Sequence, residues 1–301
     1  TGTNQIIGPM FEHYMRNAML ALLADDDSGA TLVEIPRMFT DAEFRKQKLT
    51  KVTDPMVRQF WLQEYPQSQR GQQSADMLSY VISKIGRFIS NDMMRNIVGQ
   101  SKSAFDLRDI MDHKKILLIN LSKGLTGDLN SNLLGFILVS KLQMAALSRA
   151  DLPESEREDF YLYVDEFQNV TTDSISIILS EARKYHLNLT VAHQFVAQLD
   201  EKIREAVLGN VGTMVSFTIG APDVEVIGKQ FAPELSSNDL INIENRNAYV
   251  KLLIDGAVSK PFNMTALPPM GEARPKVAQA LKNLSRLKYG RDKRIVESEI
   301  A

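Results

Sequence analysis

The sequence predicts an α/β fold in which a parallel sheet is flanked by helices, with a helical region before the sheet and a β-hairpin after it. Two apolar runs, at residues 115–121 and 160–164, have the length of strands buried on both faces of a parallel sheet. The segment 128–149 between them is a predicted helix of about 33 Å. Strand, helix and strand in this order form a βαβ unit with a right-handed connection. An Asp-Gly pair at 255–256 separates two β-rich runs and predicts the hairpin.

The composition is that of a globular protein. The chain has 301 residues, 44% of them hydrophobic, which suits one large or two modest domains. The net charge of −2 does not indicate a nucleic-acid binder, although a local basic patch is compatible with it. The absence of cysteine excludes disulfides and thiol catalysis. The longest apolar stretch, 133–147, is shorter than a bilayer span. No signal peptide is visible, and a start at Thr1 suggests part of a longer protein.

Residues 1–112 are predicted to form a helical subdomain. Apolar residues recur at helical spacing in 9–24. Asp54 is placed to cap a helix that has proline at its first position. No residue in this region indicates catalysis by itself, and we interpret His13 and Trp61 as packing residues.

The run FYLYVDEFQN at 160–169 carries the first indication of function. Its apolar strand is followed directly by two carboxylates, Asp165 and Glu166. Acids at the carboxyl end of a buried parallel strand lie where open α/β sheets bind ligands. This is the pattern of a Walker B motif, in which the first acid holds Mg²⁺, usually through water, and the second polarises the attacking water. The alternative is a strand that ends in a solvated acidic turn.

A helix from 174 to about 186 is predicted after the acids, with N-cap residues at 171–173. Arg183 falls in its last turn, where the helix dipole favours a cation. The functional alternative for Arg183 is an arginine finger that reaches the γ-phosphate of a neighbouring subunit.

The next predicted strand, 187–192, ends in His193 and Gln194. An amide at the tip of this strand can sense a γ-phosphate or position water, and the alternative is a simple turn residue. No second His or Cys has ligand spacing to His193, so we expect it to orient or pack rather than to bind metal.

The remaining predicted elements are helices at 197–208 and 221–231, a strand at 213–219 between them, and the hairpin strands 248–254 and 258–265.

The charged tail from Lys276 to Arg294 contains seven Lys or Arg residues. We expect a solvated helix or a disordered tail, and contact with a phosphate backbone is the functional alternative.

A phosphate-binding loop of the form GxxxxGK[ST] does not occur in the sequence. Without it, Asp165 and Glu166 have no triphosphate to act on. The chain is then either the carboxyl-terminal part of an ATPase or no ATPase. If the strand that carries such a loop is missing, the strand at 187–192 lies beside a gap with unpaired backbone groups. We therefore expect the chain alone to be poorly stable or prone to aggregation.

The run FYLYVDEFQNVTTDSISIILSEARKYHLNLTVAHQ (160–194), with INLSKG at 119–124, resembles the HerA–FtsK superfamily of ATPases. Within it, the sequence is most similar to the TraG/TraD-type conjugative coupling proteins of type IV secretion. The resemblance extends from MFEHYMRNAMLALL (10–23) to AYVKLLIDG (248–256).

This resemblance implies a RecA-like P-loop ATPase core, of which the chain holds a part. On that basis, 1–112 is a helical subdomain inserted between Walker A and Walker B. Residues 113–268 are the carboxyl-terminal part of the core with its hairpin, and 269–301 form a charged helical or disordered tail.

The resemblance also implies roles for single residues. Asp165 would bind Mg²⁺ through water, Glu166 would be the catalytic base, and Gln194 would be the sensor. Asp165, Glu166 and Gln194 would together contact ATP, and Arg183 becomes the leading finger candidate. Since Walker A is missing, this chain alone is predicted to be inactive.

The family further implies a homo-hexameric ring that moves DNA through its pore at the cytoplasmic face of the bacterial inner membrane. Its partners would be type IV secretion or relaxosome proteins, and membrane attachment would come only from an anchor outside this chain. Two alternatives are an ATPase that acts on protein cargo and a catalytically inactive scaffold.

Overall fold

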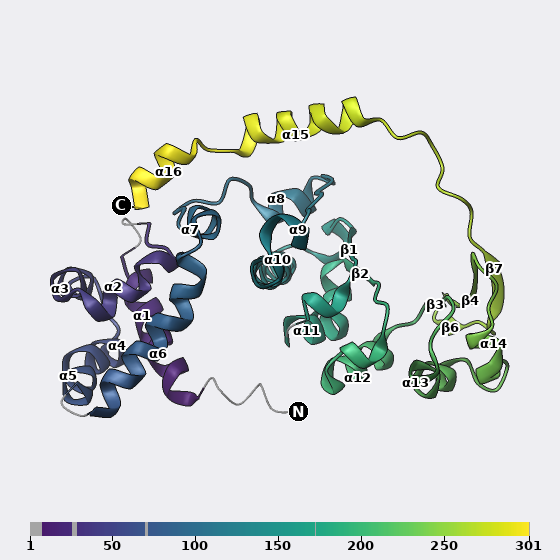
Figure 1. Ribbon diagram of the computed structural model, residues 1–301, viewed down its shortest axis with the longest axis horizontal. Coiled ribbons are helices and arrows are strands. Elements are labelled where there is room, and N and C mark those ends of the chain that lie inside the picture. Colours follow the sequence, from purple (N-terminus) through teal and green to yellow (C-terminus); the bar gives the residue numbers. More distant parts are fainter. Residues whose placement is uncertain (1–7, 26–28, 70–71, 172, 301) are drawn as a thin grey trace. The chain divides into compact units, whose positions relative to one another are not determined.

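Figure 1 shows the computed structural model, which describes residues 8–25, 29–69, 72–171 and 173–300. The chain separates into two compact units. The first comprises Thr1–Ala104 and Gln279–Ala301, and the second is Phe105–Ala278. The sequence suggested a boundary after residue 112, but the division lies before α8 (Leu107–Asp112). Leu107, Ile110 and Met111 of this helix are buried in the core of the second unit.

The first unit is helical, as predicted. Its core contains an aromatic cluster in which the Trp61 side chain is buried and donates from Nε1 to the Asn17 carbonyl at 3.1 Å. Trp61 is thus confirmed as a packing residue, whereas the exposed His13 ring packs edge-on against Phe60 on one side and has its Nε2 3.2 Å from Glu64 Oε2. Asp54 caps its helix through Met56 N and Val57 N. The elements are α1 (Pro9–Leu23), η2 (Leu32–Glu34), α2 (Ile35–Thr40), α3 (Ala42–Leu49), α4 (Pro55–Gln59), a π-helical turn η3 (Phe60–Glu64), α5 (Tyr65–Ser68), α6 (Gln72–Ile89), α7 (Asp92–Val98) and α16 (Lys293–Ile300).

The tail is helical in two pieces, α15 (Pro275–Tyr289) and α16. Helix α15 has no buried residue, whereas Val296 of α16 is buried and Glu297 accepts a hydrogen bond from Asn96 of α7 at 3.5 Å. The predicted solvated helix therefore describes α15 but not α16, which packs against α7 because its side chains find a partner there.

The predicted βαβ unit of 115–121, 128–149 and 160–164 does not form, because 115–121 is not a strand, and the two parallel strands of the second unit are instead joined through α11 (Asp173–Glu181). Strands β1 (Phe160–Val164) and β2 (Leu187–Val191) are parallel and pair in register from Phe160 with Leu187 to Val164 with Val191. Apolar residues of α10 and α11 form one core with the strands. The helical elements are α8, α9 (Lys123–Thr126), α10 (Asp128–Ser148), η4 (Arg149–Asp151), η5 (Glu154–Glu156), η6 (Phe167–Asn169), α11 (Asp173–Glu181), η7 (Ala182–Tyr185), η8 (Val196–Gln198) and α12 (Glu201–Asn210).

Helix α10 belongs to this core. By length and composition alone, the stretch Asp128–Asp151 is long and apolar enough to cross a membrane. This stretch is longer than the apolar run 133–147 seen in the sequence. Val139, Leu142 and Ala146 of the helix are nevertheless buried against the rest of the unit.

The prediction that β1 is buried on both faces is wrong. Its residues alternate, with Leu162 packed against the core and Tyr161 and Tyr163 59% and 71% exposed. Strand β2 pairs only with β1 among the described strands, so its other edge is unpaired, as expected.

The predicted strand at 115–121 is also wrong. The segment is not in a ladder, and Ile116 and Leu118 are 89% and 86% exposed. It nevertheless follows the direction of β1, because Lys114 Nζ lies 2.9 Å from Glu158 Oε2 before the strand, and Lys123 Nζ lies 2.9 Å from Asn169 Oδ1 after it. An apolar run specifies a segment that can pair, whereas a strand requires a neighbour that exchanges backbone hydrogen bonds with it.

The last part of the second unit contains the predicted hairpin. Asp255 and Gly256 have φ of 50° and 80°, as a type I′ turn requires. The hairpin is interrupted where Leu252 N donates to Ser259 Oγ at 2.9 Å, so its outer and inner parts pair separately. The elements are β3 (Met214–Ser216), α13 (Ala221–Phe231), α14 (Ser237–Ile241), β4 (Asn247–Lys251), β5 (Leu253–Ile254), β6 (Ala257–Val258) and β7 (Phe262–Thr265), with sheet orders β3-β4-β7 and β5-β6. The strand predicted at 213–219 is shorter, as β3, and the helix predicted at 197–208 is shifted along the chain, as α12.

Candidate active site

The ends of β1 and β2 place the predicted site residues together. After the last pair of the ladder, Ala192 N donates to the Val164 carbonyl at 2.9 Å, and Phe167 N donates to the Ala192 carbonyl at 2.9 Å. The two chains therefore stay side by side beyond the strands. Asp165 and Glu166 follow one strand and Gln194 follows the other, so all three lie at the same edge of the sheet.

Glu166 occupies a left-handed backbone conformation, with φ of 49° and ψ of 46°. This conformation costs an ordinary residue roughly 1–2 kcal/mol, so the surroundings must hold it. Asp165 Oδ1 accepts from Glu166 N at 2.9 Å, and the next side chain, Phe167, is fully buried. Helix α10 packs directly against the same turn at its residue Gly135. A Cβ atom at that position would lie 2.3 Å from Val170 Cγ1, so no larger side chain fits there.

Two amides hold the Glu166 carboxylate. Gln194 Nε2 donates to Glu166 Oε1 at 2.6 Å, and Gln168 Nε2 donates to Glu166 Oε2 at 2.6 Å. Sequence reasoning had identified Gln194 but missed Gln168, although an amide two residues after the second acid was visible in the motif. The resulting group is a carboxylate oriented by two donors, an arrangement suited to a fixed proton acceptor.

A magnesium ion fits the donor set at this edge. Asp165 is exposed at the end of β1, and only its Oδ1 is engaged with the backbone. Within the described residues there is no group of three or more His, Cys, Asp or Glu that could hold a metal. A single carboxylate completed by water and phosphate oxygens is a usual environment for Mg²⁺, which rarely uses an all-protein cage.

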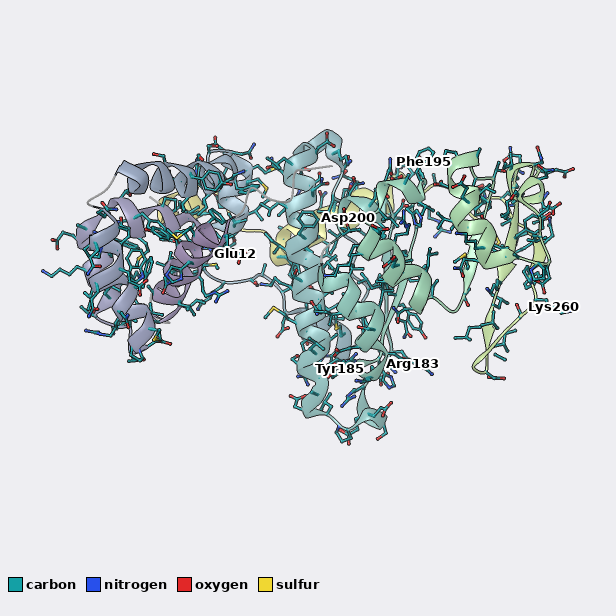
Figure 2. The ribbon with its side chains drawn as sticks, turned by 90° about the horizontal axis from the view of Figure 1, so that it is seen from below. Glu12, Arg183, Tyr185, Phe195, Asp200 and Lys260 are labelled. Carbon is teal, nitrogen blue, oxygen red and sulfur yellow. The ribbon has the colours of Figure 1, made fainter. Side chains whose placement is uncertain are left out.

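Arg183 lies away from these residues. Helix α11 ends at Glu181, so Arg183 is in the following 3₁₀ turn and not in the last α-helical turn that was predicted. It precedes β2 whereas Gln194 follows it, and five strand residues span about 16 Å. Figure 2 shows Arg183 and Tyr185 in the lower part of the view and Phe195 in the upper part. The Arg183 side chain is exposed and makes no ion pair or side-chain hydrogen bond with the described residues.

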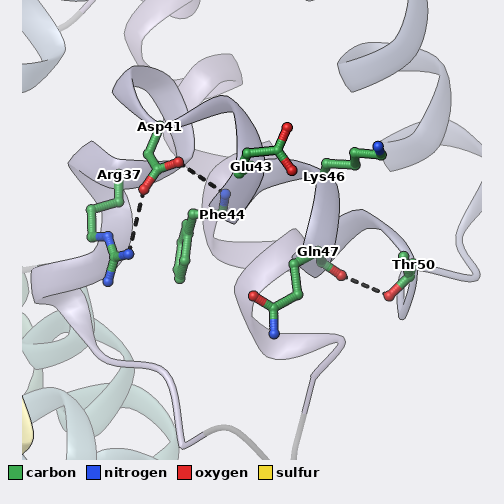
Figure 3. Close-up of a pocket in the computed structure, with 7 residues that line it drawn as sticks. All are labelled: Arg37, Asp41, Glu43, Phe44, Lys46, Gln47 and Thr50. Carbon is green, nitrogen blue, oxygen red and sulfur yellow. Dashed lines mark hydrogen bonds and ion pairs between the residues drawn. The ribbon is translucent and has the colours of Figure 1, made fainter.

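An open pocket of 490 Å³ lies in the first unit and contains none of the predicted site residues. It is formed by α2 and α3, where Arg37 pairs with Asp41 at 3.4 Å and stacks 4.2 Å from the Phe44 ring centroid (Figure 3). These contacts occur within and between two neighbouring helices of the same unit. They offer no arrangement for chemistry, so the edge of the parallel sheet remains the candidate site.

His193, next to Gln194, is half-buried, and this burial lowers its pKa below the ordinary value of 6.5, while the charge of Asp223 opposes the shift. The unfolded chain therefore takes up a proton near pH 6.5 where the native state does not. The stability that the neutral His193 gives to the folded protein is therefore fully present above pH 6.5. It is lost as the pH falls below that value, because protonation then favours the unfolded chain. We expect His193→Gln to weaken the loss of stability between pH 7.5 and 5.5, as measured by urea denaturation. The exposed His113→Gln serves as control, and equal slopes in both variants would contradict the effect.

The structure has a mixed α/β fold of the RecA-like kind, in which helices surround a small parallel sheet. The chain is similar to the bacterial conjugative coupling protein TrwBdeltaN70 in its unbound form, with a TM-score of 0.56 and 14% identity over 86% of this chain and 69% of that one. It also aligns with the genome packaging NTPase B204 of Sulfolobus turreted icosahedral virus 2 in complex with AMPPCP, with a TM-score of 0.39 and 15% identity over 56% of this chain and 74% of that one. No protein-family model matches the sequence, and a search of curated proteins gives no match.

Proposed function

We propose that this chain is the carboxyl-terminal part of a ring-forming ATPase motor that couples ATP hydrolysis to DNA translocation in conjugative type IV secretion. The observation that carries the proposal is the Glu166 carboxylate, held by Gln194 from the neighbouring strand and placed beside Asp165. The proposal also requires a phosphate-binding loop, and these 301 residues contain no GxxxxGK[ST].

In this proposal Glu166, Gln194 and Asp165 have different roles at the γ-phosphate. Glu166 accepts the proton of the attacking water, and Gln194 contacts the γ-phosphate from the adjacent strand. Asp165 would hold Mg²⁺ through water, and the ion would supply positive charge at the phosphate oxygens. Since hydrolysis depends on positioning and electrostatics more than on covalent chemistry, the fixed orientation of Glu166 is the main contribution of this part of the chain.

Arg183 is proposed as the arginine finger of a neighbouring subunit. It lies at the opposite end of β2 from Gln194, so it cannot serve the acids of its own chain. An exposed arginine without an ion pair among the described residues is free to reach phosphate across a subunit boundary. This role requires the homo-hexameric ring.

The remaining parts of the proposal concern location and partners. We place the intact protein at the cytoplasmic face of the bacterial inner membrane, attached by a region outside this chain, with type IV secretion or relaxosome proteins as partners. Helix α15 is exposed and carries Lys276, Lys282, Arg286 and Lys288 without an acid, which suits contact with a DNA backbone.

DNA is expected to raise the rate of ATP hydrolysis by the intact protein, extended upstream to include the phosphate-binding loop. Contacts with phosphates release counterions, so the stimulation should be largest at low salt and fall as the salt concentration rises. Steady-state ATP turnover with and without DNA at two salt concentrations measures this. Turnover that is independent of DNA at low salt, with capture of secretion-channel components, would favour a motor for protein cargo.

A further inference from the structure

Gln168 lies on the turn η6, only two residues after Glu166, and is half-buried. Its position is fixed by the neighbouring backbone. Asn169 N donates to the Glu166 carbonyl at 2.9 Å, and Val170 N donates to the Phe167 carbonyl at 3.0 Å. Because the adjacent Phe167 side chain is fully buried, the turn cannot rotate without exposing it. Gln168 is therefore presented to Glu166 by a rigid local structure.

The chemistry of the contact determines which way the Gln168 amide faces. The Nε2 atom lies 2.6 Å from Glu166 Oε2. Turning the amide over would place Oε1 against the carboxylate, where two acceptors would repel. In the present orientation, Gln168 Oε1 is buried and has no hydrogen-bond partner among the described residues. Glu166 is thus the group that orients this amide, and the amide in turn orients Glu166.

The two amides that hold Glu166 differ in their origin. Gln194 comes from β2, is exposed, and donates to Oε1. Gln168 comes from the same turn as Glu166 and donates to Oε2. Contact of Gln194 with a nucleotide would remove the first bond, whereas Gln168 shares the turn of Glu166 and would keep the second. Oε1 would then be free of its donor while the carboxylate keeps its direction.

We propose that Gln168 is a positioning residue that fixes the Glu166 carboxylate through Oε2 and leaves Oε1 as the oxygen that accepts the proton. This inference rests on the proposed ATPase function and adds a residue to it. Gln194 then acts as the releasable donor and Gln168 as the permanent one. A single permanent donor is sufficient to keep the acceptor oxygen aimed while the other lone pairs remain open.

The activity test uses Gln168→Leu in the intact protein, with Gln198→Leu as control, since Gln198 is an exposed glutamine in another 3₁₀ turn. We expect kcat for ATP hydrolysis to fall by roughly ten- to a hundredfold, the order for losing a hydrogen bond to a charged group. KM should stay within about twofold, because nucleotide binding is not affected. The control should keep its kcat.

A double-mutant cycle separates positioning from a general structural effect. If Gln168 acts through Glu166, then Gln168→Leu should change the residual kcat by less than about twofold when Glu166→Gln is already present. An equal loss in both backgrounds would overturn the proposal, as would an unchanged kcat in Gln168→Leu alone.

A second measurement does not depend on ATP hydrolysis. The side-chain amide protons of Gln168, assigned by their absence in Gln168→Leu, should shift in the NMR spectrum of the intact protein when Glu166 is replaced by Gln, because a hydrogen bond to a charged acceptor is lost. If they do not shift, the contact is overturned whether or not the intact protein is an ATPase. If they shift but the intact protein hydrolyses no ATP, the failure lies in the proposed function, and the inferred role falls with it.

Discussion

Replacement of Glu166 by Gln is expected to lower ATP turnover by the intact protein by about 10² or more, the usual order for losing general acid–base assistance. The amide keeps the size of the carboxylate but cannot accept a proton from the attacking water. It also loses the charge that the amides of Gln168 and Gln194 contact at 2.6 Å each. The measurement is kcat for ATP hydrolysis at saturating nucleotide.

The matched control for this variant is Glu154→Gln, an exposed glutamate in the turn before β1. We expect its kcat to equal that of the unchanged protein. Circular dichroism and the unfolding midpoint should show that Glu166→Gln is folded. If Glu166→Gln leaves kcat unchanged, the carboxylate is not the base. No ATP turnover by the unchanged intact protein would instead favour a scaffold relative of the motor ATPases.

Replacement of Arg149 by Met is expected to lower the free energy of unfolding of the second unit by roughly 1–3 kcal/mol, the range for leaving a buried acceptor without its donor, since Asp112 keeps its bond to Arg108. Arg149 is fully buried. Its Nε donates to Asp112 Oδ1 at 2.9 Å, and its terminal nitrogens donate to the Tyr185 and Glu158 carbonyls at 2.9 and 2.5 Å. The variant leaves one carboxylate and two carbonyls without this donor.

The same contacts connect Arg149 to the candidate site. Glu158 and Tyr185 lie two residues before β1 and β2, so one guanidinium ties together the amino ends of the two strands whose carboxyl ends carry Glu166 and Gln194. Lysine cannot replace this fork of donors, so Arg149→Lys should also be destabilised.

Urea denaturation of the second unit measures the effect of Arg149→Met. Arg183→Met is the matched control, since Arg183 is exposed and makes no side-chain hydrogen bond with the described residues, and its free energy of unfolding should change by less than about 0.5 kcal/mol. Equal midpoints for the two variants would contradict the structural role of Arg149.

Local patterns in the sequence predicted much of the fold because each of them depends on near neighbours. The apolar run before Asp165, the long segment of α10 and the Asp-Gly turn at 255 are recognisable within a few residues, and all three elements form as predicted. The edge of the sheet that carries Asp165, Glu166 and Gln194 follows from the same patterns, since parallel strands end at a common side. The roles of these residues, and of Arg183, remain predictions.

Other features depend on partners that lie far along the chain. The run 115–121 has the composition of a strand, but no neighbour pairs with it in the described structure. The exposure of Tyr163 depends on which face of the sheet the helices cover, and nothing in the strand itself specifies that. Residue Arg149, with a charge that usually lies at the surface, is buried because three acceptors from separate segments converge on it.

The sequence by itself determined the strand β1, the long helix α10 and the two carboxylates that follow β1, because backbone propensity and side-chain periodicity are local properties. Only the tertiary structure decided that Gln168 and Gln194 share the carboxylate of Glu166, each 2.6 Å away, and that Arg183 lies at the other end of β2. A hydrogen bond of that length requires the turn geometry and the strand register to be correct together, and neither can be obtained from residue spacing alone.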